Sequence, residues 1–274
     1  MQAYIDVTVI LLPVAYLLTA GVYGAVFFQR NERAERVAPL LLWGTLLLHT
    51  AHLVLTGIEW AQFPATTVSQ ALSVVAYAVA VVYAVVERLG RERTTGFWIL
   101  AMVFLLQLVS ALLRRPNPPH REIFESPLFA THVLLALLGY AAFVLAAGYG
   151  FLFLELYREL KAGRFSTFYG KLPPLEVLER MMVGALFVGF LALTGAAAAG
   201  AVWAHRLFPG AWLQDPKILI TFAILLFYAV ALALRRFRRW QGRQTAMASL
   251  TGLGAILLSL FAVNFFFSDF HTFL

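Results

Sequence analysis

The chain has no cysteine, and this absence removes several kinds of chemistry at once. Without thiols it can form no disulfide, no thiolate metal site and no thiol redox couple of its own. A cofactor bound by this chain must therefore take its protein ligands from histidine, methionine, tyrosine or carboxylate side chains.

Charged residues are scarce as well. They make up 13% of the 274 residues, whereas hydrophobic residues make up 61%, and the mean hydropathy is +0.80. A soluble domain carries about one quarter charged residues, so a water-soluble globular fold is excluded. The apolar residues form long runs rather than the short alternating segments of a membrane β-barrel. The sequence therefore predicts an all-α integral membrane protein.

Eight apolar runs are long enough to be membrane helices. They predict a bundle of about eight transmembrane helices in a single polytopic membrane domain over residues 1–274. No connector is long enough to fold alone, and no internal repeat is found. The runs cover roughly 7–28, 38–58, 67–86, 97–113, 128–154, 175–204, 217–234 and 246–267.

Basic residues alternate in number from one connector to the next. The connectors after the first, third, fifth and seventh runs carry 15 arginine and lysine residues, and the alternate connectors carry 5. The positive-inside rule assigns the richer connectors to the cytoplasm, so both termini are expected outside. The net charge of +7 is then a signal of topology, and nucleic-acid binding is not expected. The basic inner connectors also suit anionic lipid.

All six histidines fall in the outer half of this layout. Histidine is the ligand expected for an iron porphyrin that is held without a thiolate. Two of the six, His132 and His271, lie at the outer interface on segments far apart in sequence, so the topology can bring one to each face of a haem. Either residue alone is equally suited to an ordinary place at the membrane boundary. The others are His49, His52, His120 and His205.

His49 and His52 lie within the second run and share a helix face, because they are three residues apart. Ionisable residues inside a membrane span are functional-site hypotheses by default. This pair could bind a metal, share a proton or hydrogen-bond to a neighbouring helix. The sequence leaves these alternatives open.

Familiar hydrolytic and ion-pumping motifs are missing. The chain has no glycine-rich phosphate loop, no H-E-x-x-H and no G-x-S-x-G. Its three lysines, Lys161, Lys171 and Lys217, all lie at the ends of spans, which excludes a Schiff base in the middle of the membrane.

The second half of the chain carries a recognisable series of segments. A histidine-led helix at 131–143 is followed by Leu-Glu-Arg at 178–180, a tryptophan-containing helix end at 200–204, the segment 210–217 and the closing residues 270–274. In order and spacing this series resembles the CcsA/CcmC cytochrome c assembly family, which includes short HemX-like proteins. The resemblance marks residues 127–274 as a family-like haem-handling core.

The resemblance implies a haem site on the outer side. In the family, two outer histidines that bracket a tryptophan-rich segment are the axial ligands of haem. This implies that His132 and His271 bind a non-covalent haem b, with Trp203, Trp212 and Asp215 as the porphyrin platform. A deeper site at His49 and His52 is a further possibility. Arginines that suit haem propionates, or equally lipid phosphates, are Arg114, Arg115, Arg121 and Arg206.

Two departures from the family pattern refine this expectation. Gln214 stands where the family has a second tryptophan, and Ala233 stands where complete synthases have a histidine. The resemblance therefore implies the short HemX-like branch, a haem-binding, transfer or assembly protein rather than a complete cytochrome c synthase. It would lie in a bacterial-type cell membrane with its haem on the periplasmic side.

The expected function is to hold haem at that face for cytochrome c maturation or for haem delivery or sensing. The expected partners are haem, apocytochrome c or another assembly subunit of the membrane. Two alternatives stay open. One is a haem-free permease whose outer histidines are only interfacial. The other is a scaffold subunit with a degenerate haem platform, whose basic cluster from Arg235 to Arg243 docks a cytoplasmic partner or anionic lipid.

Overall fold

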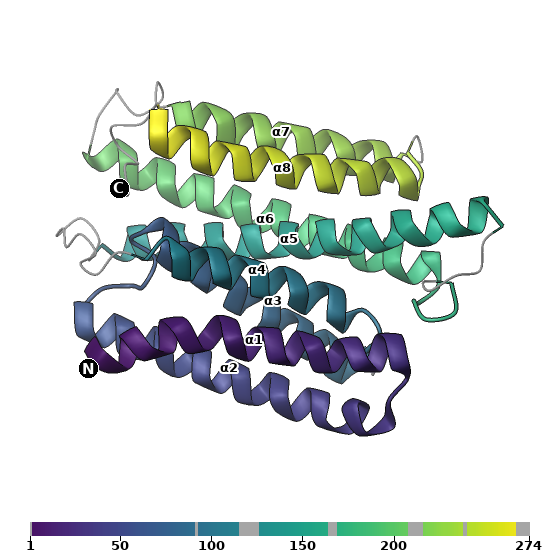
Figure 1. Cartoon of the computed structure of the whole chain (residues 1–274). Coiled ribbons are helices and arrows are strands. Elements are labelled where there is room, and N and C mark those ends of the chain that lie inside the picture. Colours follow the sequence, from purple (N-terminus) through teal and green to yellow (C-terminus); the bar gives the residue numbers. More distant parts are fainter. Residues whose placement is uncertain are drawn as a thin grey trace. The chain divides into compact units, whose positions relative to one another are not determined.

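The computed structural model describes residues 2–90, 93–114, 126–163, 169–207, 216–237 and 240–266. Over these ranges the chain forms eight α-helices and no strand (Figure 1). The prediction of an all-α chain is therefore confirmed over the described part. The helices are α1 (Gln2–Gln29), α2 (Glu32–Trp60), α3 (Val68–Gly90), α4 (Gly96–Leu112), α5 (Pro127–Lys161), α6 (Leu175–Leu207), α7 (Pro216–Arg236) and α8 (Gly242–Phe266).

Each helix corresponds to one predicted apolar run, and the largest difference at any one boundary is at the end of α5. The apolar run stops at residue 154, but the helix continues to Lys161. Glu155 and Arg158 form an ion pair three residues apart on this extension, a spacing that supports a helix outside the apolar region.

Six helices of the described chain, α1 to α3 and α5 to α7, are long and apolar enough to cross a membrane. The chain is therefore a multi-pass helical membrane protein. The count of eight spans and the outer location of both termini stay predictions.

By its internal contacts the chain divides into two compact units. Unit 1 comprises Met1–His120 and Phe165–Pro173, and unit 2 comprises Arg121–Arg164 and Pro174–Leu274. Unit 1 thus contains α1 to α4, and unit 2 contains α5 to α8. The expectation of one membrane domain stays a prediction.

In unit 1, α1 packs against α2 and α4, and α3 packs against the same two helices. The turn between α1 and α2 is tight, with Arg30 in the left-handed region at φ +51. The Asn31 side chain then caps α2 by accepting hydrogen bonds from the backbone N–H groups of Arg33 and Ala34, at 2.9 and 3.1 Å. At the opposite end of the unit, Asp6 of α1 forms an ion pair with Arg114, which follows α4.

Part of the connector between α5 and α6 also belongs to unit 1. Lys171 donates a hydrogen bond from Nζ to the Phe28 carbonyl at 2.9 Å, and Arg30 donates to the Gly170 carbonyl at 3.0 Å. The Lys171 ammonium also lies 5.5 Å from the ring centroid of Phe27. These contacts join two connectors that the count of basic residues assigns to the same side of the membrane.

In unit 2, α5 packs against α6 and α8, and α7 packs against the same two helices. The interior is aromatic and aliphatic. Phe143 of α5 stacks on Tyr228 of α7 with ring centroids 4.1 Å apart and planes 7° from parallel. A Cβ at Gly189 of α6 would lie 2.8 Å from the Phe143 ring, so the small residue allows the close approach of α5 and α6.

Candidate functional site

His132 lies in the first turns of α5, and its ring faces α6 in unit 2. Its Nδ1 lies 2.8 Å from the carbonyl oxygen of Ala196. A carbonyl oxygen can only accept, so Nδ1 carries the proton and donates it. In the neutral imidazole the lone pair is then on Nε2. A backbone carbonyl that fixes the tautomer and orientation of the ring in this way is typical of metal-binding histidines.

Gly200 lies four residues after Ala196, on the face of α6 that meets His132. A Cβ at this position would lie 2.5 Å from Nδ1 and 2.8 Å from Cε1 of the imidazole. Any larger residue would therefore displace the ring from its place beside α6. The Ala196 carbonyl and the absence of a side chain at Gly200 together fix the position of His132.

Two aromatic residues lie at the same end of this helix pair. Phe129 precedes His132 by three residues on α5, and Trp203 follows Gly200 by three residues on α6. Their ring centroids are 5.3 Å apart, with planes inclined by 47°. Phe129 is buried, whereas His132 and Trp203 are half-buried. A half-buried imidazole beside an aromatic pair presents both a metal ligand and an apolar contact surface for a flat macrocycle.

The described part of this end of unit 2 fits one face of a haem. It offers an imidazole of fixed tautomer, a notch in α6 at Gly200 that holds the imidazole, and the aromatic pair Phe129 and Trp203. Arg206, one turn beyond Trp203, is exposed and stays a predicted partner of an anionic group. The other expected members of the site lie outside the described residues: His271, Trp212, Asp215, Arg115 and Arg121.

His49 lies in the interior of unit 1 and uses both ring nitrogens. Nδ1 is 2.9 Å from the Tyr16 hydroxyl, and Nε2 is 2.9 Å from Ser73 Oγ. Ser73 in turn donates to Gln107 Oε1 at 3.1 Å. It follows that Nε2–H donates to Ser73 and that the Tyr16 hydroxyl donates to Nδ1. A neutral imidazole satisfies this arrangement fully.

His52 makes a similar contact nearer the Asp6 end of unit 1. Its Nδ1 is 2.7 Å from Thr8 Oγ1, whose hydroxyl donates to the Ile5 carbonyl at 3.0 Å. His52 therefore donates from Nδ1 to Thr8. The centroids of the His49 and His52 rings are 6.2 Å apart.

The sequence leaves three roles open for the pair His49 and His52: binding a metal, sharing a proton or hydrogen-bonding to a neighbouring helix. Of these, the hydrogen bonds to neighbouring helices are present in the structure. Within the described residues, no group of three or more histidine, aspartate or glutamate side chains could hold a metal ion. A second haem site at the pair stays a prediction. Arg114, expected near an anionic ligand, is paired with Asp6 of the chain itself.

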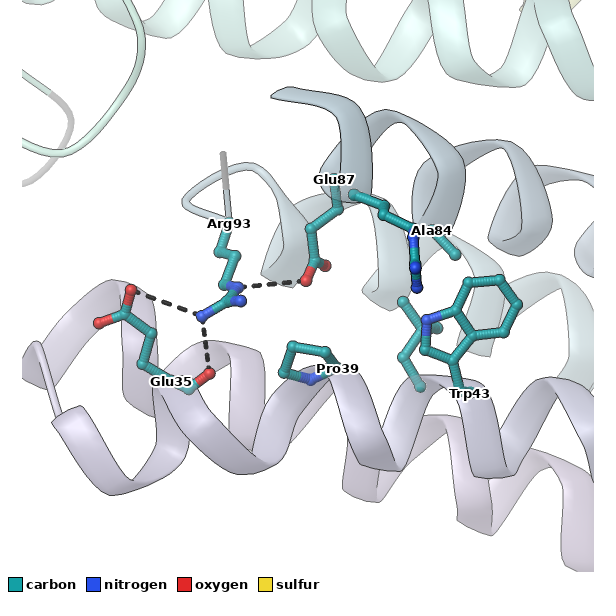
Figure 2. Close-up of a pocket in the computed structure, with 8 residues that line it drawn as sticks. Glu35, Pro39, Trp43, Ala84, Glu87 and Arg93 are labelled. Atoms are coloured by element: carbon teal, nitrogen blue, oxygen red, sulfur yellow. Dashed lines mark hydrogen bonds and ion pairs between the residues drawn. The ribbon is translucent and has the colours of Figure 1, made fainter. Parts of the chain in front are cut away.

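The opposite end of unit 1 contains a pocket of about 420 Å³ that the sequence does not predict. Figure 2 shows Arg93 between Glu35 and Glu87, with Pro39 and Trp43 also at the pocket. Arg93 Nε lies 3.2 Å from Glu87 Oε1, and its Nη1 lies 3.6 Å from Glu35 Oε1. The other oxygen of Glu87 accepts a hydrogen bond from the Tyr23 hydroxyl.

Some of these contacts could be predicted in part from the sequence. Thr8, Tyr16, Thr19 and Tyr23 recur at helical spacing along one face of α1, and this pattern was available as a signal for a polar interior. For Ala196 the functional atom is a backbone carbonyl, which no side-chain pattern can reveal.

A family model described as Cytochrome C assembly protein matches residues 33–271. Protein HemX of Bacillus subtilis (strain 168) is 25% identical over 264 residues, which cover 95% of this chain and 95% of that protein. Cytochrome c biogenesis protein CcsA of Prochlorococcus marinus (strain AS9601) is 26% identical over 297 residues, with 98% of this chain and 95% of that protein covered. Protein HemX of Brevibacillus brevis is 26% identical over 246 residues, with coverages of 89% and 90%.

Proposed function

Since the chain belongs to the cytochrome c assembly family, we propose that it is a haem-binding membrane protein with a role in cytochrome c biogenesis. In this proposal His132 and His271 hold haem b non-covalently at the outer face of a bacterial cell membrane. The names of the matched relatives, CcsA and HemX, agree with the family resemblance and its HemX-like branch. Because the chain has no cysteine to form a thioether, the proposed binding of haem is reversible.

The observation that carries the proposal is the hydrogen bond from His132 Nδ1 to the Ala196 carbonyl. This bond sets the tautomer in which Nε2 has the lone pair needed by a metal. Gly200 adds the space that this orientation requires. A histidine that served only as a polar residue at the membrane boundary would need neither a fixed tautomer nor a notch in the facing helix.

The remaining site residues have defined parts in the proposal. His271 supplies the second imidazole, and Trp203, Trp212 and Asp215 form the platform. Arg115, Arg121 and Arg206 are the proposed cations for the propionates, whereas Arg114 is already paired with Asp6. His132 and His271 would hold the haem, which would supply an iron centre, and Trp203 would help to orient it.

Two uses of such a site are part of the proposal. Covalent attachment of haem to a cytochrome needs cysteines that this chain does not have. The partner would therefore be an apocytochrome c with its own cysteines, or another membrane subunit of the assembly machinery. Delivery of haem to that partner, or sensing of haem, is the proposed role, and the excess of basic residues in alternate connectors supports an outward-facing site.

A haem titration of the purified full-length protein tests the proposal. The wild type should bind haem and show the low-spin absorption spectrum of two axial histidines. His132→Ala and His271→Ala should each lose that spectrum and bind haem about tenfold or more weakly, the range seen when a metal site is disturbed. Free imidazole should restore the low-spin spectrum of His132→Ala. His205→Ala is the control, because His205 is exposed at the same end of α6.

Other outcomes would favour the alternatives. Unchanged haem affinity in both His132→Ala and His271→Ala would overturn the assignment of the ligands. Solute flux into vesicles by a protein that binds no haem would indicate a permease. Co-purification of a membrane subunit or cytoplasmic partner with no haem spectrum would indicate a scaffold, with the residues from Arg235 to Arg243 as the first place to examine.

A further inference from the structure

The interior of unit 1 is unusually polar for a bundle of apolar helices. Of the 17 buried polar or charged side chains among the described residues, tyrosine and tryptophan aside, 15 belong to this unit. Burying such groups is unfavourable unless each finds a hydrogen-bond partner, and aliphatic residues would fill the same space without this cost. The burial of so many polar side chains therefore indicates that they serve a function beyond filling the interior.

Several of the buried side chains pair across helices in successive layers. We call these layers the polar ladder and define it by four rungs. The first is the hydrogen bond from Tyr23 to Glu87. The second joins Thr19 Oγ1 and Thr45 Oγ1 at 2.9 Å. The third is Tyr16, His49 and Ser73, and the fourth is His52 with Thr8.

On α2 the second, third and fourth rungs are about one helical turn apart, whereas on α1 the first three rungs are about one turn apart and Thr8 of the fourth lies about two turns beyond Tyr16. Thr19 and Tyr23 are separated by four residues on α1, as are Thr45 and His49 on α2, and His49 and His52 are separated by three. Side chains at these spacings are neighbours on a helix surface, about 5 to 6 Å apart at Cβ. From residue 8 to residue 23, α1 rises about 22 Å at 1.5 Å per residue. The ladder therefore covers most of the thickness of a membrane's hydrocarbon core, which is about 30 Å.

Exposed charged groups lie near both ends of the polar ladder. Glu87 lines the pocket in Figure 2, beside Glu35, whose side chain is 57% exposed. At the other end Thr8 is two residues from Asp6, whose side chain is 52% exposed. The ladder side chains between these ends are each at most 6% exposed.

The chemistry of the rungs suits proton transfer. Hydroxyl groups and neutral imidazoles both donate and accept hydrogen bonds. An imidazole can take up a proton at one nitrogen and release another from the second, which makes histidine a proton shuttle. His49 has a hydroxyl at each of its ring nitrogens, the arrangement that such a transfer requires.

We propose that the polar ladder of unit 1 conducts protons between the two ends of the unit. A proton binds at the Glu87 end, and another leaves at the end marked by Thr8 and Asp6. The hydrogen bonds within each rung run between helices, so water between successive rungs carries the proton from one rung to the next. Only O–H and N–H bonds form and break, and rotation of the hydroxyls, imidazoles and waters restores the starting state. Nothing is oxidised or reduced, and the direction follows the pH difference and the membrane potential.

The test is proton flux in phosphatidylcholine vesicles that contain the purified full-length protein and an internal pH-sensitive dye. A potassium gradient with valinomycin sets the membrane potential. Flux should exceed that of vesicles without protein. Tyr16→Phe and Thr45→Val, which keep the shape of the side chain but remove the hydroxyl, should each lower the flux by about tenfold or more, because a positioned proton-transfer group contributes at least this much to a rate.

Unit 1 offers matched controls for both substitutions. Thr50 lies on α2 with Thr45, and Tyr77 contacts the His49 ring as Tyr16 does, with centroids 5.1 Å apart. The hydroxyls of Thr50 and Tyr77 bond to each other at 2.8 Å in an exposed position outside the ladder. Thr50→Val and Tyr77→Phe should therefore leave the flux within about twofold, since neither removes a proton-transfer group.

Two results would overturn the proposal. One is wild-type flux no greater than that of protein-free vesicles. The other is equal flux in the ladder variants and their controls, which would mean that the rungs serve only to hold the helices together. Circular dichroism establishes that each variant is folded, and the two matched pairs are independent, so that either pair alone decides the question.

Discussion

The two units of this membrane protein distribute their polar groups in opposite ways. Unit 1 buries a network of side-chain hydrogen bonds between helices in its interior. In unit 2 the buried hydroxyls of Thr245 and Ser249 bond instead to carbonyls of their own helix, at 3.3 and 2.9 Å, and its helices meet through stacked rings and small residues. The histidine of unit 2 that faces another helix, His132, lies at the end of its helix pair and is half-buried.

This difference indicates what each unit can bind or transfer. An end site with a half-buried imidazole is reachable by a large, flat ligand. A closed interior lined with hydroxyls and imidazoles admits nothing larger than a proton or water, but it can connect two surfaces. We therefore propose haem binding at the end of unit 2 and proton transfer in the interior of unit 1. Substitutions that affect one unit should leave the activity of the other unchanged.

The largest expected effect concerns the notch at Gly200. In Gly200→Ala the new Cβ collides with the His132 ring, so the imidazole must move from the position that Ala196 fixes. We expect haem affinity to fall by about tenfold to hundredfold, as when the support of a metal ligand is disturbed. Gly184→Ala is the control on the same helix, because a Cβ at Gly184 would meet nothing within 4 Å. Equal haem affinity in the two variants, measured by titration, would contradict the proposed role of the notch.

The next effect tests the tight packing of unit 2. Tyr228 is fully buried and stacked on Phe143, and a Cβ at Gly252 of α8 would collide with its hydroxyl. Because the ring is held by the stack, Gly252→Ala should lower the free energy of unfolding by about 2 kcal/mol, typical of overpacking. Thermal unfolding in detergent measures this loss. If Gly252→Ala is as stable as the wild type, Tyr228 has room to move. The contrast between the tightly packed interior of unit 2 and the hydrogen-bonded interior of unit 1 would then be weaker.

A smaller effect is expected from His49, which tests the hydrogen-bonded interior of unit 1. His49→Phe removes the partners of Tyr16 and Ser73 and should cost about 1 to 2 kcal/mol, because buried polar groups are left unsatisfied. His205→Phe, at an exposed position, should change stability by less than about 0.5 kcal/mol. The same unfolding measurement compares the two, and equal stabilities would mean that the polar interior contributes nothing to the fold.

The smallest effect should come from Glu35 at the pocket of unit 1. Its carboxylate is 3.6 Å from Arg93, and the two side chains are 57% and 33% exposed. Solvent screens such a pair, so Glu35→Ala should cost less than about 0.5 kcal/mol. Glu87→Ala should cost more, because Glu87 is buried and also accepts a hydrogen bond from Tyr23. The reverse order in thermal unfolding would contradict the view that this pocket opens to water.

Much of the fold follows from local sequence. Each of the eight apolar runs forms a helix, because runs of this length have no other way to satisfy their backbone in a membrane. The end of α5 was placed too early, since its last turns are held by polar residues such as Glu155 and Arg158 that hydropathy does not count as helical. His132 was singled out by its place at the outer interface, and the family resemblance then implied its role as a haem ligand.

The contacts that define the two sites were not predictable in the same way. The bond between His132 and Ala196 depends on how α5 and α6 align along their length, and 64 residues separate the two partners. The rung from Tyr23 to Glu87 also spans 64 residues. Local propensity sets neither the alignment of α5 with α6 nor that of α1 with α3, because each arises from the packing of whole helices. The polar face of α1 was visible in the sequence, but its partners were not.

The most direct test of the account is the electron paramagnetic resonance spectrum of the ferric protein loaded with one equivalent of haem. The account predicts a low-spin signal in the wild type and its loss in His132→Ala and in His271→Ala, with His205→Ala unchanged. A low-spin signal that persists in His132→Ala would contradict the assignment of His132 as an axial ligand, and with it the placement of the haem site at the end of unit 2.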